Sequence, residues 1–202
     1  MPTELFKLLG SEEAVVSSLG NMTQGLGFPL RPVETFSPLN IVTIEALRTF
    51  SIIDQLPTGL GVELQVVFGS PQTTEFWDID AAGAMTCLVE DEYQLSVRFS
   101  IGRRGSAGGL AQIYLRMMID GVQEGASAHV ILESPDFEIP ASFTLARSFL
   151  VDEVLTFEVI RDTDGVDEGG LLAGNPDVVG WNDSPSASIS ITRTSVTTVA
   201  NP

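Results

Sequence analysis

The chain has 202 residues, of which 44% are hydrophobic and 18% charged, with 27 acidic against 10 basic side chains and a formal net charge of -17. That length allows one sizeable hydrophobic core that needs neither disulfides nor metals for stability. The negative charge excludes a general nucleic-acid binder, because affinity for phosphate backbones comes largely from cationic side chains. It disfavours anionic membrane surfaces for the same reason.

The first forty residues differ from the rest and predict an irregular N-terminal arm over residues 1–40. Two short helical pieces are expected at Thr3–Leu9 and Ser11–Leu19, the second capped by the Ser11 side chain. Repeated Gly and Pro then interrupt regular structure. The apolar side chains of the arm must be buried, either on the parent domain or on a neighbouring subunit. The candidate partner-binding residues are Phe6, Leu9, Phe28 and Phe36.

The N-terminus does not resemble a targeting sequence. Residues 1–7 lack the basic start and the long apolar run of a signal peptide. No stretch reaches the ~18 uninterrupted apolar residues of a membrane span. We therefore expect the protein to be made and to fold in a cytoplasm.

From residue 41 onward the hydrophobic period is two, which is typical of half-buried strands. Tyr93 to Ile101 and Ile113 to Ile119 alternate apolar and polar side chains, and Asp120-Gly121 between two such runs is a strong hairpin signal. Further strand-like runs are Ile41–Phe50, Val62–Phe68, Phe76–Ile79, Ala84–Val89, Ala128–Leu132, Ala141–Leu150, Leu155–Ile160 and Ser188–Thr192. Nine or ten short strands predict an all-β domain over residues 41–202, built as an antiparallel two-sheet jelly-roll sandwich.

No catalytic or metal-binding constellation stands out. His129 is the only histidine, and a strand histidine on a polar face is its expected role, because a triad would need it beside a buried acid. One imidazole cannot supply the ligand set of a metal-dependent jelly-roll enzyme. The loop Asp162–Glu168 is interpreted as a solvated turn, with a weak cation site as the alternative, since its Gly comes too early for a calcium loop. We expect no catalytic residue, no metal and no cofactor.

Several single residues have structural interpretations. Cys87 lies in a strand-like run and is expected to be a small buried apolar residue. Trp77 and Trp181 lie beside turns and are expected to plug the ends of the sandwich, with the indole N–H on a backbone carbonyl. A subunit interface or a glycan platform are the alternatives. Arg103 and Arg104, in a glycine-rich strand connection, are either part of a plain exposed hairpin or pair with an acidic neighbour in another subunit.

An ordered set of motifs runs from about Phe50 to Arg193. Its segments are Pro57-Thr58-Gly59-Leu60, Leu64 to Gly69, Asp80 to Thr86, Tyr93 to Phe99 with Gly102-Arg103-Arg104-Gly105, Ile119-Asp120-Gly121-Val122, Leu155 to Asp162, Gly169-Gly170-Leu171-Leu172 and Gly180 to Ala187. Together these segments resemble jelly rolls of the tumour-necrosis-factor and complement globular-head class, as found in small phage virion proteins.

The resemblance implies a non-enzymatic virion protein that forms a homotrimer around a threefold axis. Its expected partners are itself and the major capsid protein or neighbouring decoration subunits, with no nucleic acid and no membrane. A capsid decoration (cement) protein on the surface of a bacteriophage head, assembled in the host cytoplasm, is favoured, because no collagen-like repeat or heptad seam precedes the module. The alternative is a receptor- or glycan-binding tip of a tail fibre or head fibre.

Overall fold

The computed structural model describes residues 39–105, 108–133 and 138–198, with side chains described from Glu45 to Thr194 within those ranges. The chain divides into two compact units, Asn40–Thr197 and the pair of terminal segments Met1–Leu39 and Thr198–Pro202. The predicted arm, residues 1–40, lies outside the described residues except at its last two positions.

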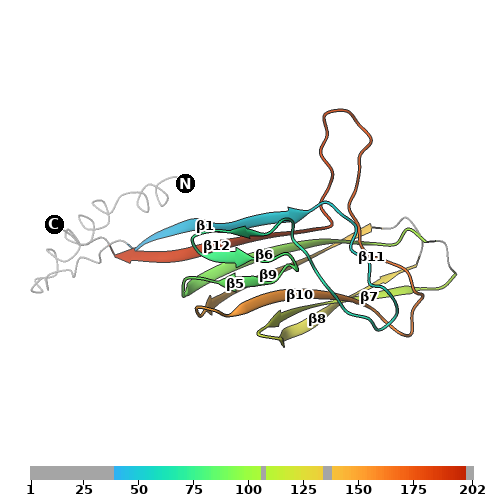
Figure 1. The fold of residues 1–202 in the computed structure, drawn as a ribbon, viewed down its shortest axis with the longest axis horizontal. Coiled ribbons are helices and arrows are strands. Elements are labelled where there is room, and N and C mark those ends of the chain that lie inside the picture. The colour runs from blue at the N-terminus through green and yellow to red at the C-terminus, as the bar shows by residue number, and fades with distance from the viewer. Residues whose placement is uncertain (1–38, 106–107, 134–137, 199–202) are drawn as a thin grey trace, which may run out of the picture. The chain divides into compact units, whose positions relative to one another are not determined.

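Every regular element in the described ranges is a β-strand, and the strands form two antiparallel sheets (Figure 1). The first sheet has the order β1-β12-β6, with β9 on the other side of β6 and the short β11 beside its end. The second sheet has the order β3-β4-β5-β10-β7-β8, with β2 also on β10. The first sheet comprises β1 (Leu39–Ser51), β6 (Asp91–Gly102), β9 (Glu138–Phe149), β11 (Gly170–Leu171) and β12 (Ala187–Thr198). The second comprises β2 (Leu64–Gln65), β3 (Gln72–Thr73), β4 (Trp77–Ile79), β5 (Met85–Cys87), β7 (Ala111–Ile119), β8 (Val122–Leu132) and β10 (Val154–Arg161).

The core lies between the sheets and is built by the two-residue alternation of the long strands. In β6 and β10 every second side chain is buried, and the side chains between them face outward. At the centre, Phe68, Phe99 and Phe157 pack with ring centroids 5.6 to 6.0 Å apart. At one end, Trp77 lies edge-on to Tyr93 and Phe149. The predicted all-β fold class is confirmed, and the arrangement is that of a jelly-roll sandwich.

Two local predictions have different outcomes. The Asp120-Gly121 hairpin is confirmed: both residues have positive φ, 49° and 75°, as a tight two-residue turn between β7 and β8 requires. The run Val62–Phe68, predicted as one strand, pairs as a strand only at Leu64–Gln65. Beyond β2, the side-chain amide of Gln55 accepts from Val67 N at 2.7 Å and donates to Val67 O at 2.9 Å. The Gln55 side chain thus bonds both polar groups of the Val67 backbone, while Val66 N still donates to Phe157 O of β10 at 2.8 Å.

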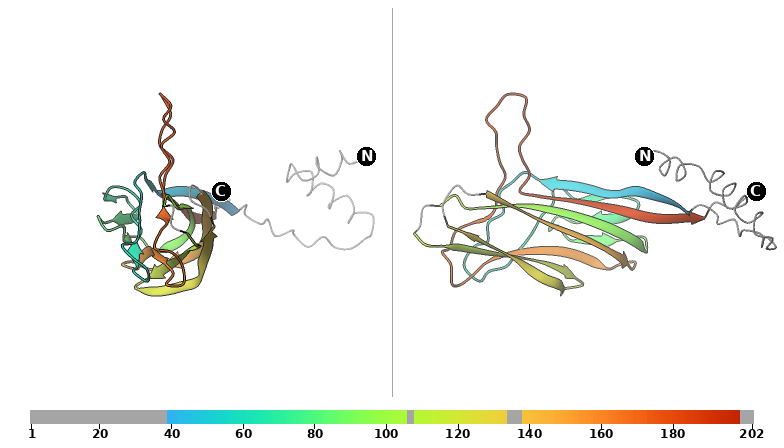
Figure 2. Two further views of the ribbon diagram at one scale, coloured as in Figure 1. Left: turned by 90° about the vertical axis from the view of Figure 1, so that its right-hand side faces the viewer. Right: turned by 180° about the vertical axis from the view of Figure 1, so that it is seen from behind.

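The segment between β11 and β12 stands out from the sandwich in every view (Figures 1 and 2). Residues 173–185 of this segment are called the finger here. Its two limbs are joined near the root, where Gly174 and Ser184 exchange backbone hydrogen bonds of 3.1 and 2.8 Å. The finger is the most prominent projection of the described part of the chain.

Candidate interaction surface

The outer face of the first sheet carries mostly short, uncharged side chains across three strands, with Gln94 and Arg98 as the two long ones. The register aligns β12, β6 and β9 over the same stretch, so their outward positions form crosswise rows. These positions alternate with core residues and are Ser188, Ser190 and Thr192 on β12, Gln94, Ser96 and Arg98 on β6, and Ser142, Thr144 and Ala146 on β9. None of the nine is a carboxylate, although the chain has 27; the outward carboxylates of these strands, Glu92 on β6 and Glu138 on β9, lie beyond the two ends of the rows.

The outer face of the second sheet has the opposite character. There Arg116 forms ion pairs with Glu63, at 2.7 Å, and with Glu158, at 2.5 Å. The hydrogen bond to Glu158 is the main cause that raises the pKa of the Arg116 guanidinium. Beside this cluster the rings of Tyr114 and His129 stack at 4.2 Å with an interplanar angle of 7°. The second sheet therefore has carboxylates near the middle of its outer face, whereas the rows on β12, β6 and β9 form a region without carboxylates that is flanked by Glu92 and Glu138.

Two arginines of the first sheet form no ion pair with the residues that the structure describes. Lys7 and Arg31 lie outside the described residues, so eight of the 10 basic side chains belong to the described part. Six of these form ion pairs, namely Arg103, Arg104, Arg116, Arg147, Arg161 and Arg193. Arg48 on β1 and Arg98 on β6 are exposed and have no carboxylate partner among the residues that the structure describes. On so acidic a protein, both are available to an external anion.

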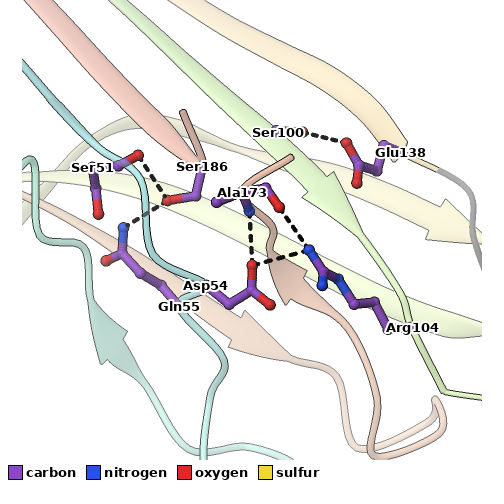
Figure 3. A network of polar contacts seen from close by, with 8 residues as sticks. All are labelled: Ser51, Asp54, Gln55, Ser100, Arg104, Glu138, Ala173 and Ser186. Carbon is purple, nitrogen blue, oxygen red and sulfur yellow. Dashed lines mark hydrogen bonds and ion pairs between the residues drawn. The ribbon is translucent and has the colours of Figure 1, made fainter. Parts of the chain in front are cut away.

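Polar contacts fix the root of the finger to the segment that follows β1 (Figure 3). Asp54 accepts a hydrogen bond from Ala173 N at 2.8 Å. Arg104 donates to Ala173 O at 2.6 Å and lies 3.3 Å from the Asp54 carboxylate. On the other limb, Ser186 N donates to Ser51 O at 2.9 Å. Because both limbs are tied down, the finger leaves the sandwich in a defined direction.

The tip of the finger is apolar and exposed. Val178, Val179 and Trp181 are 54%, 103% and 74% exposed. A backbone hydrogen bond of 3.1 Å from Trp181 N to Val178 O closes the turn, and Gly180 takes the left-handed conformation, with φ 87°, that glycine adopts without a steric penalty. Exposed apolar side chains that gather on a projecting loop are typical of an interaction site.

A cleft of about 940 Å³ lies between the finger and the outer face of the first sheet. Its basic groups are Arg48 and Arg98, and its apolar groups include Phe50, Ile52 and Trp181. The remaining lining residues are Thr49, Ser96, Asn182, Asp183, Pro185, Ser188, Ile189 and Ser190. Asp183 is the only carboxylate in this set. The cleft is thus locally cationic and partly apolar.

The predicted partner-binding residues have different places. Phe6, Leu9, Phe28 and Phe36 lie outside the described residues. Arg103 is 1% exposed, bonds Glu168 at 2.6 Å and donates to Gly109 O at 2.7 Å, so its charge is engaged inside the domain. Arg104, with a side chain 57% exposed, supports the root of the finger. Partner binding through these residues stays a prediction.

The acidic loop Asp162–Glu168 uses two of its carboxylates to bind arginines of its own domain. Asp167 pairs with Arg161 at 2.8 Å, and Glu168 pairs with Arg103. Asp162 accepts from the backbone N–H of Asp164 at 3.0 Å. Within the described ranges, no three His, Cys, Asp or Glu side chains are grouped to hold a metal ion.

Four residues singled out in the sequence have clear positions. Cys87 is buried, and burial is the main cause that raises the pKa of its thiol, so its predicted role as a buried apolar residue is confirmed. His129 is exposed on β8, as expected for a polar face. Trp77 is fully buried, but its indole N–H has no hydrogen-bond partner in the described part of the chain, contrary to expectation. Trp181 is 74% exposed rather than a core plug, because it lies on the finger, outside the space between the two sheets.

Sequence reasoning missed the finger and Arg48. The signal for the finger was present, since Val178-Val179-Gly180-Trp181 is an apolar run enclosed by Asn, Pro and Asp residues and has no alternation that would place it in a strand. No sequence pattern singled out Arg48, because what distinguishes it is that no carboxylate among the described residues lies close enough to form an ion pair with it. Such an absence is a property of the tertiary structure.

No helix in the described ranges is long and apolar enough to cross a membrane.

No family model matches the sequence, and none of the curated proteins compared with it matches. Among solved structures, the chain is similar to Eiger TNF from S. frugiperda, with 11% sequence identity and a TM-score of 0.40. The alignment covers 82% of this chain and 97% of that one. The superposition is loose, and it carries no information about a site or a partner.

Proposed function

We propose that the protein is a non-enzymatic structural module that associates with copies of itself through the outer face of its first sheet. The observation that carries the proposal is the distribution of charge. A chain with a formal net charge of -17 repels its own copies except where carboxylates are missing. The rows of short side chains on β12, β6 and β9 form such a region, and the two unpaired arginines adjoin it.

The physical chemistry of this face suits a close contact with another copy. Short side chains lose little conformational entropy on burial and allow a segment of the partner to approach the sheet closely. Like charges placed against one another across an interface cost several kcal/mol, so a region without carboxylates is the least unfavourable place for copies to meet. Closed rotational symmetry satisfies such a face without producing filaments, which favours a cyclic assembly such as a homotrimer.

At a finer level, we propose that these trimers decorate a bacteriophage head as a capsid decoration (cement) protein. The resemblance of Phe50 to Arg193 to small virion jelly rolls supports this. Its partners would be the major capsid protein and neighbouring decoration subunits, with the arm over residues 1–40 reaching a neighbour. Modest contacts suffice on a lattice, because tethered contacts act at a high effective concentration.

Charge variants test where the copies meet. The double variant Ser96→Glu with Ser190→Glu places two carboxylates on the proposed face and should convert the assembly to monomers in sedimentation equilibrium. Thr156→Glu on β10 is the matched control, because it adds a carboxylate to the outer face of the second sheet and should leave the assembly unchanged. An unchanged assembly in the double variant, with an unchanged melting temperature, would rule out this face.

Binding to particles tests the finer proposal. Purified heads that lack the protein should take up the full chain in regular high copy and become more resistant to heat or chelator-induced loss of DNA. A truncated chain without residues 1–38 should remain folded but bind heads more weakly. Recovery of the protein only from tails or fibres would contradict a role in head decoration.

A second candidate function is supported by one observation, the exposed Trp181 on a projecting loop. An aromatic ring in that position can stack on the apolar face of a sugar, as a receptor- or glycan-binding tip requires. Because Trp77 is buried and the chain has 2 tryptophans, ligand-dependent fluorescence changes would report on Trp181. A glycan that shifts this emission in the native chain, but has no effect in Trp181→Phe, would favour the second function.

A further inference from the structure

We infer that residues 177–179, at the tip of the finger of one copy, insert into the cleft beside the finger of the next copy. The inference rests on the proposed self-association and names the contact that would close the ring. It combines three features of the described residues: the apolar tip of the finger, the cationic cleft, and the root whose hydrogen bonds hold the finger in a fixed direction.

Charge complementarity is the first argument. Arg48 and Arg98 lie in the cleft without a carboxylate partner among the described residues, while the cleft itself contributes only Asp183. Asp177 lies at the finger tip, is exposed, and has a positive φ of 40° that turns the chain at this point. Its carboxylate is free to meet an arginine of another copy. A charge-assisted hydrogen bond to guanidinium is stronger than one between neutral groups.

Apolar complementarity is the second argument. Val179 is fully exposed and Val178 more than half exposed, so the tip presents apolar surface to water. On the cleft side, Phe50 is 58% exposed and Ile52 is 48% exposed. Both sets are exposed apolar surface in the part of the chain that the structure describes. Mutual burial of the two sets removes both from water in a single contact.

The geometry of the finger is the third argument. From Gly174 to the tip the limb is about 16 Å long if extended, at roughly 3.3 Å per residue. Trp181, Asn182 and Asp183 on the returning limb line the cleft of their own copy, whereas residues 177–179 do not. The tip therefore lies beyond the cleft to which its own limb contributes. A contact between two different surface regions is heterologous, and it gives a closed ring when the rotation between copies closes.

Disulfide trapping tests the contact. The one native cysteine, Cys87, is buried, so a disulfide that forms in these variants joins the engineered thiols. A mixture of Val179→Cys and Ser188→Cys chains should form a disulfide-linked heterodimer under mild oxidation, because the tip of one copy lies beside β12 of the next. Homodimers of Val179→Cys alone would show a tip-to-tip contact and overturn the inference. A disulfide within one chain carrying both substitutions would overturn it as well.

Charge reversal gives an independent test. Asp177→Arg should weaken association at least about tenfold, as loss of a desolvated charge pair does. Arg98→Glu should weaken it likewise, and the chain carrying both substitutions should recover most of the affinity, because each reversed tip meets a reversed cleft. Melting temperatures near that of the parent chain control for folding.

The outcomes separate this inference from the function on which it rests. If the parent chain is oligomeric and Asp177→Arg and Val179→Asp leave its association constant unchanged, the finger contact is wrong while self-association through the sheet stands. If the parent chain is monomeric at all concentrations, self-association fails and the finger contact fails with it. Recovery in the chain carrying both charge reversals is the result that the inference predicts.

Discussion

Arg103 and Arg104 are adjacent in sequence but occupy opposite environments. Alternation along the end of β6 turns Arg103 inward, where Glu168 and the carbonyl of Gly109 satisfy its guanidinium. Arg104 remains largely exposed and bonds the root of the finger. A single motif of two basic residues thus contributes one buried ion pair and one surface anchor.

This difference predicts unequal costs of substitution. Arg103→Ala should lower the free energy of unfolding by about 2–3 kcal/mol, below the usual range for breaking a buried pair, because Glu168 keeps some contact with water. Arg104→Ala should lower it by less than about 1 kcal/mol, since exposed pairs contribute little. Urea unfolding of both variants measures the difference, and equal shifts in the midpoint would contradict the assignment of Arg103 to the interior.

The buried phenol of Tyr93 predicts a loss of stability at high pH. Burial is the main cause that raises the pKa of Tyr93 to about 12 from its ordinary 10.0, and its hydroxyl donates to Val89 O at 2.6 Å. Between these values the unfolded chain releases this proton more readily than the folded one, so the free energy of unfolding should fall by about 2–3 kcal/mol from pH 10 to pH 12. Tyr93→Phe should abolish the decrease in the free energy of unfolding that Tyr93 causes. The decrease caused by the Cys87 thiol should remain, because its raised pKa lowers the stability from about pH 9 upward. An unchanged slope in Tyr93→Phe, measured by denaturation at each pH, would contradict this assignment.

The two tryptophans show where inference from single residues ends. Both lie beside turn residues, and the sequence alone predicts that both plug the sandwich. Trp77 has strand neighbours on each side, and β4 places it against Tyr93 and Phe149. Trp181 follows Gly180 on a long excursion with no strand pairing beyond the Gly174–Ser184 bridge. The residues around the two tryptophans are of similar types. The two positions differ only in how far they lie from the nearest paired strand.

At the scale of elements, hydrophobic alternation predicted the long strands because each has one face in the core. It failed for Val62–Phe68 because Gln55, distant in sequence, supplies the hydrogen bonds that a strand neighbour would have made. Short strands such as β3 and β11 were also missed, since two residues carry no periodicity. The all-β class was therefore predictable, whereas the irregular edges were not.

The turn between β4 and β5 predicts a strong effect of one methyl group. Asp80 caps this turn by accepting from the backbone N–H groups of Ala82 and Ala84, at 2.9 and 2.8 Å. Gly83 has a φ of 89°, and a Cβ there would lie 2.3 Å from Val66 O. Gly83→Ala should therefore destabilise the domain by at least about 2–3 kcal/mol, the sum of backbone strain and displacement of the Val66 segment.

Gly108→Ala is the control for that substitution. A Cβ at this position meets no atom within 4 Å, and its φ is not in the left-handed region. The variant should melt within a degree or two of the parent chain, whereas Gly83→Ala should melt well below it in the same calorimetric scan. Similar melting temperatures for the two variants would show that the turn can shift away from the added methyl group.

At the scale of the whole molecule, charge is arranged unequally over the two sheets. The composition gave the excess of carboxylates, but their absence from the rows on β12, β6 and β9 depends on the register of three strands. The same holds for the cleft, where β1, β6, β12 and the finger meet. The sequence predicted an assembling structural module through its resemblance, and the tertiary structure supplies a surface through which that assembly is proposed to occur.

The mass of the full chain in solution tests the central claim most directly. Light scattering at micromolar concentration and physiological salt should give three times the 21.6 kDa of one chain, with no decrease over a tenfold dilution. Moderate added salt should preserve or strengthen the assembly if the sheet face dominates, because salt screens the repulsion between the negatively charged copies and screens buried contacts poorly. A constant mass of 21.6 kDa over the whole concentration range would contradict self-association through the first sheet.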